Sequence, residues 1–183
     1  MARNTVSRSL HDVGLAAWFG GTLANAVALN PAAAQAEGNK GTGAVANAGW
    51  DRWTPVNAAA IALHVAGSVG QLAGNQGRLA TQRGVGSMAV VKTALTAAAL
   101  GATAYSRVLG KKVSQEGAVP AQSGTTPAST TPKAVADAQR QLSALQWVIP
   151  ALTGALVVVS SLAGEQQRVT EVHKGLLGRI TPS

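Results

Sequence analysis

Long stretches without charge are the feature that most constrains this chain. No Asp, Glu, Lys or Arg occurs in residues 13–36, 53–77 or 141–164, and Lys92 is the one charged residue in 84–106. Each stretch exceeds the ~20 residues that a helix needs to cross a bilayer. A water-soluble helix of this length carries charge on its outer face. We therefore expect membrane-spanning helices near residues 9–29, 55–74, 87–109 and 142–164.

The composition favours helices that approach one another closely. Only 12% of residues are charged, and although 46% are hydrophobic, only 3% are aromatic. Glycine occurs 21 times, and small residues let helix backbones touch inside a bilayer, where lipid tails give no hydrophobic drive for association. The absence of cysteine excludes disulfides and thiol catalysis. These features predict an all-α fold, a single membrane domain over residues 1–183 that is an integral membrane bundle of four transmembrane helices.

Capping residues and prolines define the expected helix ends. Ser9 and Asp12 fit a capping box at the start of the first helix. Asn30-Pro31 is expected to end that helix, and Thr54-Pro55 to begin the second. Mobile loops are therefore expected at residues 31–53 and 118–132, followed by a polar helix from Lys133 that runs into the fourth span.

Both ends of the chain carry a further prediction. Apolar residues recur at helical spacing in residues 165–183, which predicts an amphipathic C-terminal tail lying on the membrane surface or docking on a partner. At the other end, Arg3 and Arg8 precede an apolar run and Ala34-Gln35-Ala36, the order found in secretory signal peptides. The apolar run is longer than that of a usual signal peptide, so a spanning helix is the first interpretation and cleavage of residues 1–36 the alternative.

Small residues four apart occur on every expected span. Such pairs allow close helix packing, and Gly70-x-x-x-Gly74 is a literal GxxxG motif. The glycines expected at helix contacts are Gly20, Gly21, Gly70, Gly74, Gly101 and Gly164.

Ionisable groups at membrane depth are functional candidates because they are costly to place there. His11, Asp12, His64 and Lys92 qualify. Structural roles compete with function at each of them, since Asp12 can cap a helix and Lys92 can extend to the headgroups. A charge pair between Asp12 and Lys92 is expected, because both lie near the same end of parallel spans.

His11, Trp18, Gly20 and Gly21 form a His-x6-Trp-x-Gly-Gly pattern in the first span. The pattern resembles the opening of several bacterial four-helix membrane families, among them copper-resistance D-like proteins and protoporphyrinogen-oxidase-type membrane proteins. In those families the first-helix His is associated with haem or metal. The resemblance implies His11 as a candidate ligand and the other three residues as packing residues.

Ligation of one haem by both histidines is not expected from the helix boundaries. Axial ligands must lie at one depth. His11 falls at the mouth of its helix and His64 near the middle of an antiparallel one, so ~15 Å is expected to separate them. A site with one of these histidines and another ligand, or a quinone site, stays an alternative.

The sequence favours a non-catalytic accessory or assembly subunit that packs against other subunits of a bacterial membrane complex, with no cofactor of its own. The alternatives are a haem- or quinone-binding redox protein using His11 or His64, and a small transporter or channel. No nucleotide-binding, metalloprotease or hydrolase motif is present. The net charge of +8 is spread over all the expected loops, so it does not form a nucleic-acid patch.

The expected location is a bacterial cytoplasmic membrane. Residues with GC-rich codons (Ala, Gly, Val and Arg) are abundant, which is typical of high-GC bacteria. Basic residues flank both ends of the spans equally, so the positive-inside rule does not orient the chain. We expect cytoplasmic termini.

Overall fold

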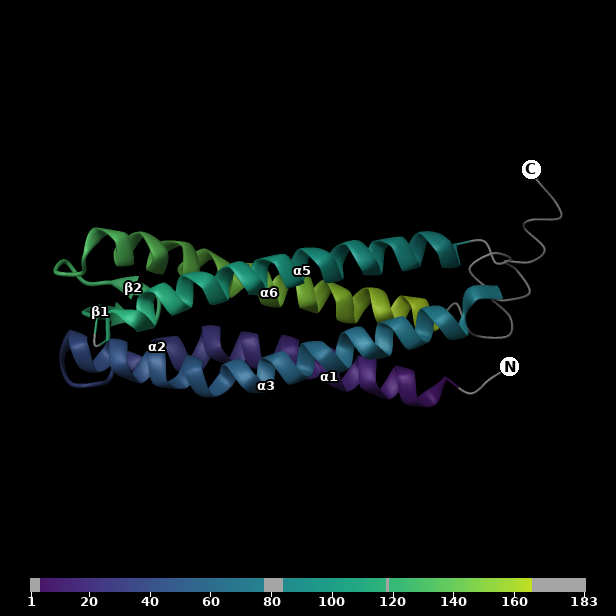
Figure 1. Ribbon diagram of the computed structural model, residues 1–183, viewed down its shortest axis with the longest axis horizontal. Helices are drawn as coiled ribbons and strands as arrows, with labels where there is room; N and C mark the ends of the chain where they lie inside the picture. Colours follow the sequence, from purple (N-terminus) through teal and green to yellow (C-terminus); the bar gives the residue numbers. More distant parts are fainter. Residues whose placement is uncertain (1–3, 78–83, 118, 166–183) are drawn as a thin grey trace.

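Four long helices form the computed structural model, which describes residues 4–77, 84–117 and 119–165 (Figure 1). Among these residues, four helices are long and apolar enough to cross a membrane, so the helical class and the four candidate spans are confirmed. The helices are Thr5–Ala33, α3 (Gly38–Gly74), α5 (Val85–Gln115) and α6 (Lys133–Glu165). The expected amphipathic tail lies outside the described residues, apart from Glu165.

The first span consists of three helical segments joined end to end. They are α1 (Thr5–Ala24), a π-helical segment η1 (Asn25–Leu29) and α2 (Asn30–Ala33). The expected end at Asn30-Pro31 is wrong, because Pro31 lies in the first turn of α2, where its missing N–H is tolerated. The expected capping box is also wrong. α1 begins at Thr5 after Asn4, so Asp12 lies two turns inside it.

The second span begins much earlier than its proline suggests. α3 starts at Gly38, so residues 38–53 of the expected loop are helical. Glycines in this part permit close packing rather than a loop: a Cβ on Gly43 would lie 2.1 Å from the Val119 carbonyl oxygen. Pro55 lies inside α3, and the Thr54 hydroxyl donates to the Trp50 carbonyl at 2.8 Å in the turn that Pro55 interrupts.

A small β-hairpin replaces the second expected mobile loop. It consists of β1 (Ala121–Ser123) and β2 (Thr126–Pro127), and it follows α5. The Gly124 N–H donates to the Asn30 carbonyl at 3.0 Å. The Asn30 side chain donates to Gln146 Oε1 at 2.7 Å and accepts from Trp50 Nε1 at 3.0 Å. One asparagine therefore joins the first span to α3, α6 and the hairpin.

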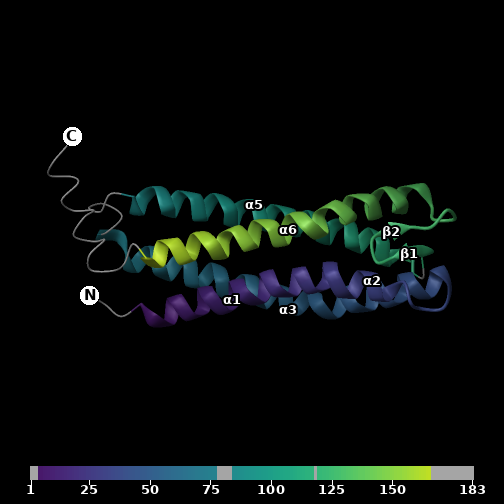
Figure 2. The same cartoon turned by 180° about the vertical axis from the view of Figure 1, so that it is seen from behind.

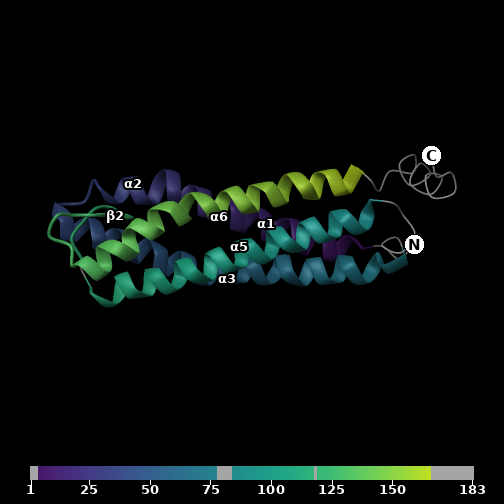
Figure 3. The same cartoon turned by 90° about the horizontal axis from the view of Figure 1, so that it is seen from above.

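The helices pack as two antiparallel pairs. α1 lies along α3, and α5 lies along α6, while α1 and α6 connect the pairs and α3 and α5 contact each other much less than α1 and α6 do (Figure 2). The start of α1 and the end of α6 lie at one end of the bundle, which we call the terminal end, and the β-hairpin lies at the other, the hairpin end (Figure 3). Both ends of a four-span chain therefore lie on one side.

The apolar core is thin and divided. One cluster contains Trp18, Ala60 and Ala99 in the middle of the bundle. The other lies near the hairpin end and contains Leu109, Val113, Val119, Val135 and Ala138. The most apolar window of the first span, Thr5–Ala33, is 33% buried, and that of α5 only 6%. α5 is thus the helix with the most surface available to lipid or a partner.

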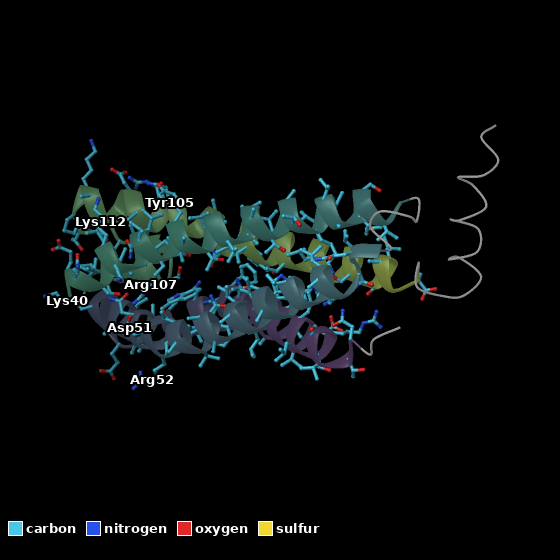
Figure 4. The ribbon with its side chains drawn as sticks, turned by 45° about the vertical axis from the view of Figure 1, so that its right-hand side comes forward. Lys40, Asp51, Arg52, Tyr105, Arg107 and Lys112 are labelled. Carbon is cyan, nitrogen blue, oxygen red and sulfur yellow. The ribbon has the colours of Figure 1, made fainter. Side chains whose placement is uncertain are left out.

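Charged side chains gather at the hairpin end. Lys40, Arg52, Arg107 and Lys112 lie there in Figure 4, together with Asp51. Arg107 and Asp51 form an ion pair at 3.5 Å that links α5 to α3. An exposed pair of this kind contributes little to stability, but it fits the headgroup zone of a bilayer rather than its interior.

Candidate functional site

The closest contact between helices occurs where two glycines face the opposite backbone. A Cβ on Gly14 of α1 would lie 2.4 Å from the His64 amide nitrogen, and one on Gly67 of α3 would lie 2.2 Å from the His11 amide nitrogen. Both distances are too short for any side chain, so only glycine fits. Each glycine follows a histidine by three residues, and the two His-x-x-Gly segments are therefore packed reciprocally on antiparallel helices.

This crossing brings His11 and His64 together in the core. Their side chains are 1% and 0% exposed, and their ring centroids are 4.6 Å apart. The expected separation in depth is wrong. Gly74 of α3 lies against Asn4, next to the start of α1, so these two residues are at the same depth. From that depth, His11 is seven residues along α1 and His64 ten residues back along α3. The remaining difference of three residues is about 4.5 Å of helix rise.

Polar and aromatic groups surround the two rings. Nδ1 of His11 lies 2.7 Å from Asp12 Oδ1, and Nε2 of His64 lies 3.3 Å from Thr96 Oγ1 on α5. Trp18 is fully buried, with its ring centroid 5.9 Å from that of His64. Within the described residues, His11 Nε2 and His64 Nδ1 have no hydrogen-bond partner. Asp12, His11, His64 and Thr96 thus form a row of polar groups from the surface of α1 through the core to α5.

The two histidines do not fit as axial ligands of one haem. Such ligation places the flat macrocycle between the two imidazoles. Here the rings are 4.6 Å apart and tilted by 46°, and the helix backbones touch at Gly14 and Gly67 beside them. No slot for a macrocycle exists between α1 and α3. The described residues also contain no cluster of three His, Asp or Glu side chains that could hold a metal ion.

A polar hollow lies beside this pair, near the terminal end. It has a volume of about 290 Å³ and receives residues from all four spans. Asp12 and Lys92 both line it, but the ion pair that the structure describes for Asp12 is with His11 and not with Lys92. The expected charge pair between Asp12 and Lys92 therefore stays a prediction, although the two side chains share one hollow.

The expected packing glycines divide into two groups. Gly21 lies against the Trp53 ring, Gly70 against Ser7 and Gly74 against Asn4. By contrast, no atom of another described residue outside their own helix turns lies within 4 Å of where a Cβ would be on Gly20, Gly101 or Gly164. Gly14 and Gly67, which lie closest to the backbone of the opposite helix, are absent from the expected set. The His-x-x-Gly spacing that they share is visible in the sequence, but small-residue spacing of this kind does not by itself identify a contact.

An open groove separates α3 from α5. Two hollows form it, with volumes of about 270 and 320 Å³, and Leu100 lines both, so they adjoin. The first, toward the hairpin end, includes Trp50, Asn57, Thr103 and Arg107, and the second includes Val65, Ser68, Met88 and Ala97. We call these two hollows together the α3/α5 groove. It follows the helices over most of their length.

No protein-family model, curated protein or solved structure matches this chain. Function must therefore be argued from the geometry of the chain itself.

Proposed function

We propose that this protein is a non-catalytic membrane subunit that binds a transmembrane helix of a partner protein in the α3/α5 groove. The observation that carries the proposal is the groove itself, which leaves α3 and α5 apart although each packs closely on its other neighbour. In a bilayer such a groove must be filled by lipid or by protein. A bacterial cytoplasmic membrane, with the termini on the cytoplasmic side, is part of the same proposal.

The walls of the groove suit a helix better than lipid chains. Its α5 wall contains the small residues Ala89, Ala97 and Ala104, which allow a helix backbone to come close. Polar atoms also lie in its walls without a partner among the described residues, namely Asn57 Oδ1 and Thr103 Oγ1. A partner helix can supply hydrogen bonds to such groups, whereas an acyl chain cannot.

Filling the groove tests this proposal. Ala97 and Ala94 are both exposed alanines on α5, but only Ala97 lines the groove. Ala97→Leu is expected to release the partner, and Ala94→Leu to retain it, when each variant is purified from its native membrane in mild detergent and studied by native mass spectrometry. A photo-crosslinker at position 97 should attach to the same membrane-spanning protein. A wild-type protein that purifies alone, or a partner retained equally by both variants, would contradict the proposal.

Ion transfer is a second candidate, and the row Asp12–His11–His64–Thr96 favours it. Histidine chains of this kind act as proton relays inside membranes. The row joins the polar hollow, lined by His11 and Asp12, to the α3/α5 groove, lined by Thr96. Under this proposal, the interior of liposomes that contain the wild-type protein acidifies when an inside-negative potential is imposed. The interior of liposomes that contain His64→Leu does not. Equal acidification by the two proteins, with both correctly inserted, would dismiss a relay through His64.

A further inference from the structure

The polar hollow at the terminal end contains more hydrogen-bonding capacity than the chain itself uses. His11 Nε2, Gln71 Nε2 and Ser160 Oγ are buried and have no partner among the described residues, and all three residues line the hollow. Leaving such atoms unpaired costs about 1–3 kcal/mol each. Three of them around one cavity indicate a ligand that completes their hydrogen bonds.

The charges of the hollow indicate the sign of that ligand. Lys92 is half-buried in the lining, and no ion pair is described for it. Arg8 is a second basic lining residue, and the acidic lining residue Asp12 lies 2.7 Å from His11 Nδ1. The Lys92 ammonium suits an anionic ligand, such as a phosphodiester.

The donors and acceptors specify the ligand further. Lys92, Gln71 and Ser160 can all donate to phosphate oxygens. A neutral His11 that donates Nδ1–H to Asp12 has a lone pair on Nε2, and it can accept from a ligand hydroxyl. A phosphodiester with a nearby hydroxyl therefore satisfies the whole set.

The position of the hollow identifies the source of the phosphodiester as a lipid. The exposed lining residues belong to α1 and α6, among them Ala16 and Val157, while Gln71 and Lys92 form the inner wall. The hollow thus opens between α1 and α6, while its inner wall is shared with the α3/α5 groove. Its polar lining residues Arg8, Gln71, Lys92 and Ser160 lie within two turns of the helix ends, at the depth of headgroups, and its apolar residues reach about one turn deeper. Basic pockets between helices at this depth bind anionic headgroups.

We propose that this hollow binds the headgroup of an anionic phospholipid with a free hydroxyl, such as phosphatidylglycerol. Arg8 and Lys92 face the phosphate, Gln71 and Ser160 donate to its oxygens, and His11 accepts from the headgroup hydroxyl. The acyl chains lie along the outer surfaces of α1 and α6, where Val13 and Val158 are 61% and 59% exposed. Gln71 and Lys92 line both this hollow and the α3/α5 groove, so the two sites adjoin, but lipid binding here does not require a partner in the groove.

The test is lipid retention by the intact protein. The probe is an equimolar mixture of phosphatidylglycerol and phosphatidylcholine, added in detergent before native mass spectrometry counts the bound molecules of each. Wild type is expected to retain phosphatidylglycerol over phosphatidylcholine, and Lys92→Gln to retain about fivefold less of it. Lys112→Gln, which removes an exposed lysine at the hairpin end, is the control and should match wild type.

Three results would overturn the proposal. They are equal retention of the two lipids by wild type, undiminished retention by Lys92→Gln, and displacement of the lipid by excess inorganic phosphate, which would reveal a site for soluble anions. If Lys92→Gln fails to fold, Ser160→Ala replaces it, because that change removes one unpartnered hydroxyl and almost no volume. It should weaken retention of phosphatidylglycerol and leave that of phosphatidylcholine unchanged, and equal retention by Ser160→Ala and wild type would count as a failure.

Discussion

At the scale of single residues, the glycines of this chain have two opposite environments. Gly14 and Gly67 let the α1 and α3 backbones touch, whereas Gly20, Gly101 and Gly164 face open space. Sequence spacing alone does not separate these groups, because every span carries small residues four apart. What separates them is which face of each helix meets a neighbour. That depends on the register between helices, and the register is set by packing over the whole pair.

Adding one methyl group tests this distinction. Gly67→Ala is expected to destabilise the protein by ~1–3 kcal/mol, because its Cβ would overlap the His11 backbone, which cannot move without shifting α1. Gly20→Ala is the matched control on the open face of α1. It should be neutral or slightly stabilising, since alanine is the better helix former by about 1 kcal/mol. Thermal unfolding in detergent, followed by circular dichroism, measures both. Equal midpoints for the two variants would refute the close contact.

At the scale of elements, four helices could be predicted but their ends could not. Proline and glycine normally interrupt helices, so Asn30-Pro31, Thr54-Pro55 and the run 38–49 all indicate boundaries. In the structure these residues lie inside helices and do not end them. Pro31 lies where no N–H is needed, Pro55 lies inside α3, and Gly43 and Gly49 fit against Val119 and Leu29. Tertiary contacts decide these cases, and a local pattern contains no information about them.

The π-helical segment η1 has a structural role that its sequence does not reveal. It directly precedes Asn30, whose side chain and carbonyl contact three other elements. A π-turn adds a residue to the helical turn and so changes the direction of every later side chain. We infer that η1 sets the direction of Asn30, which in turn fixes the hairpin on the bundle.

Removing the Asn30 side chain should therefore loosen the hairpin end. Asn30→Ala leaves the partly buried Trp50 Nε1 and Gln146 Oε1 without their partner, at a cost of about 1 kcal/mol or more. Asn47→Ala removes a single exposed hydrogen bond to Gly117 and serves as the control. Proteolysis of the 119–132 segment in detergent-purified protein measures the effect. Cleavage at the same rate in wild type and Asn30→Ala would argue against this role.

At the scale of the whole molecule, the class could be predicted because absence of charge is a global property that survives errors in helix ends. The candidate site could not. His11 and His64 were each identifiable from their membrane depth, but their contact depends on a register that shifts when α1 begins at Thr5. The hollow likewise takes residues from all four spans, so no single segment predicts it.

A bundle with this arrangement that spans a membrane has the start of α1 and the end of α6 on one side and the β-hairpin on the other. The chain has no cysteine, so single cysteines can be introduced without background. In sealed vesicles of uniform orientation, a membrane-impermeant maleimide should either label both Asn4→Cys and Glu165→Cys or label neither. It should label Ser123→Cys in the hairpin only when those two are protected. Labelling of all three in the same vesicles, with an enclosed marker still protected, would rule out four spans.

The reciprocal contact of α1 and α3 also bears on how the chain enters a bilayer during synthesis. The window of α3 has a mean hydropathy of 1.3, against 1.9 for α6, so α3 partitions into lipid less readily by itself. Both α1 and α3 are complete once residue 74 has been made, before α5 and α6 exist. If the two helices leave the translocon as a pair, His11 and His64 lie between them and are shielded from lipid. In such an insertion the glycine crossing would assist α3, because the contact can form before the second pair is made.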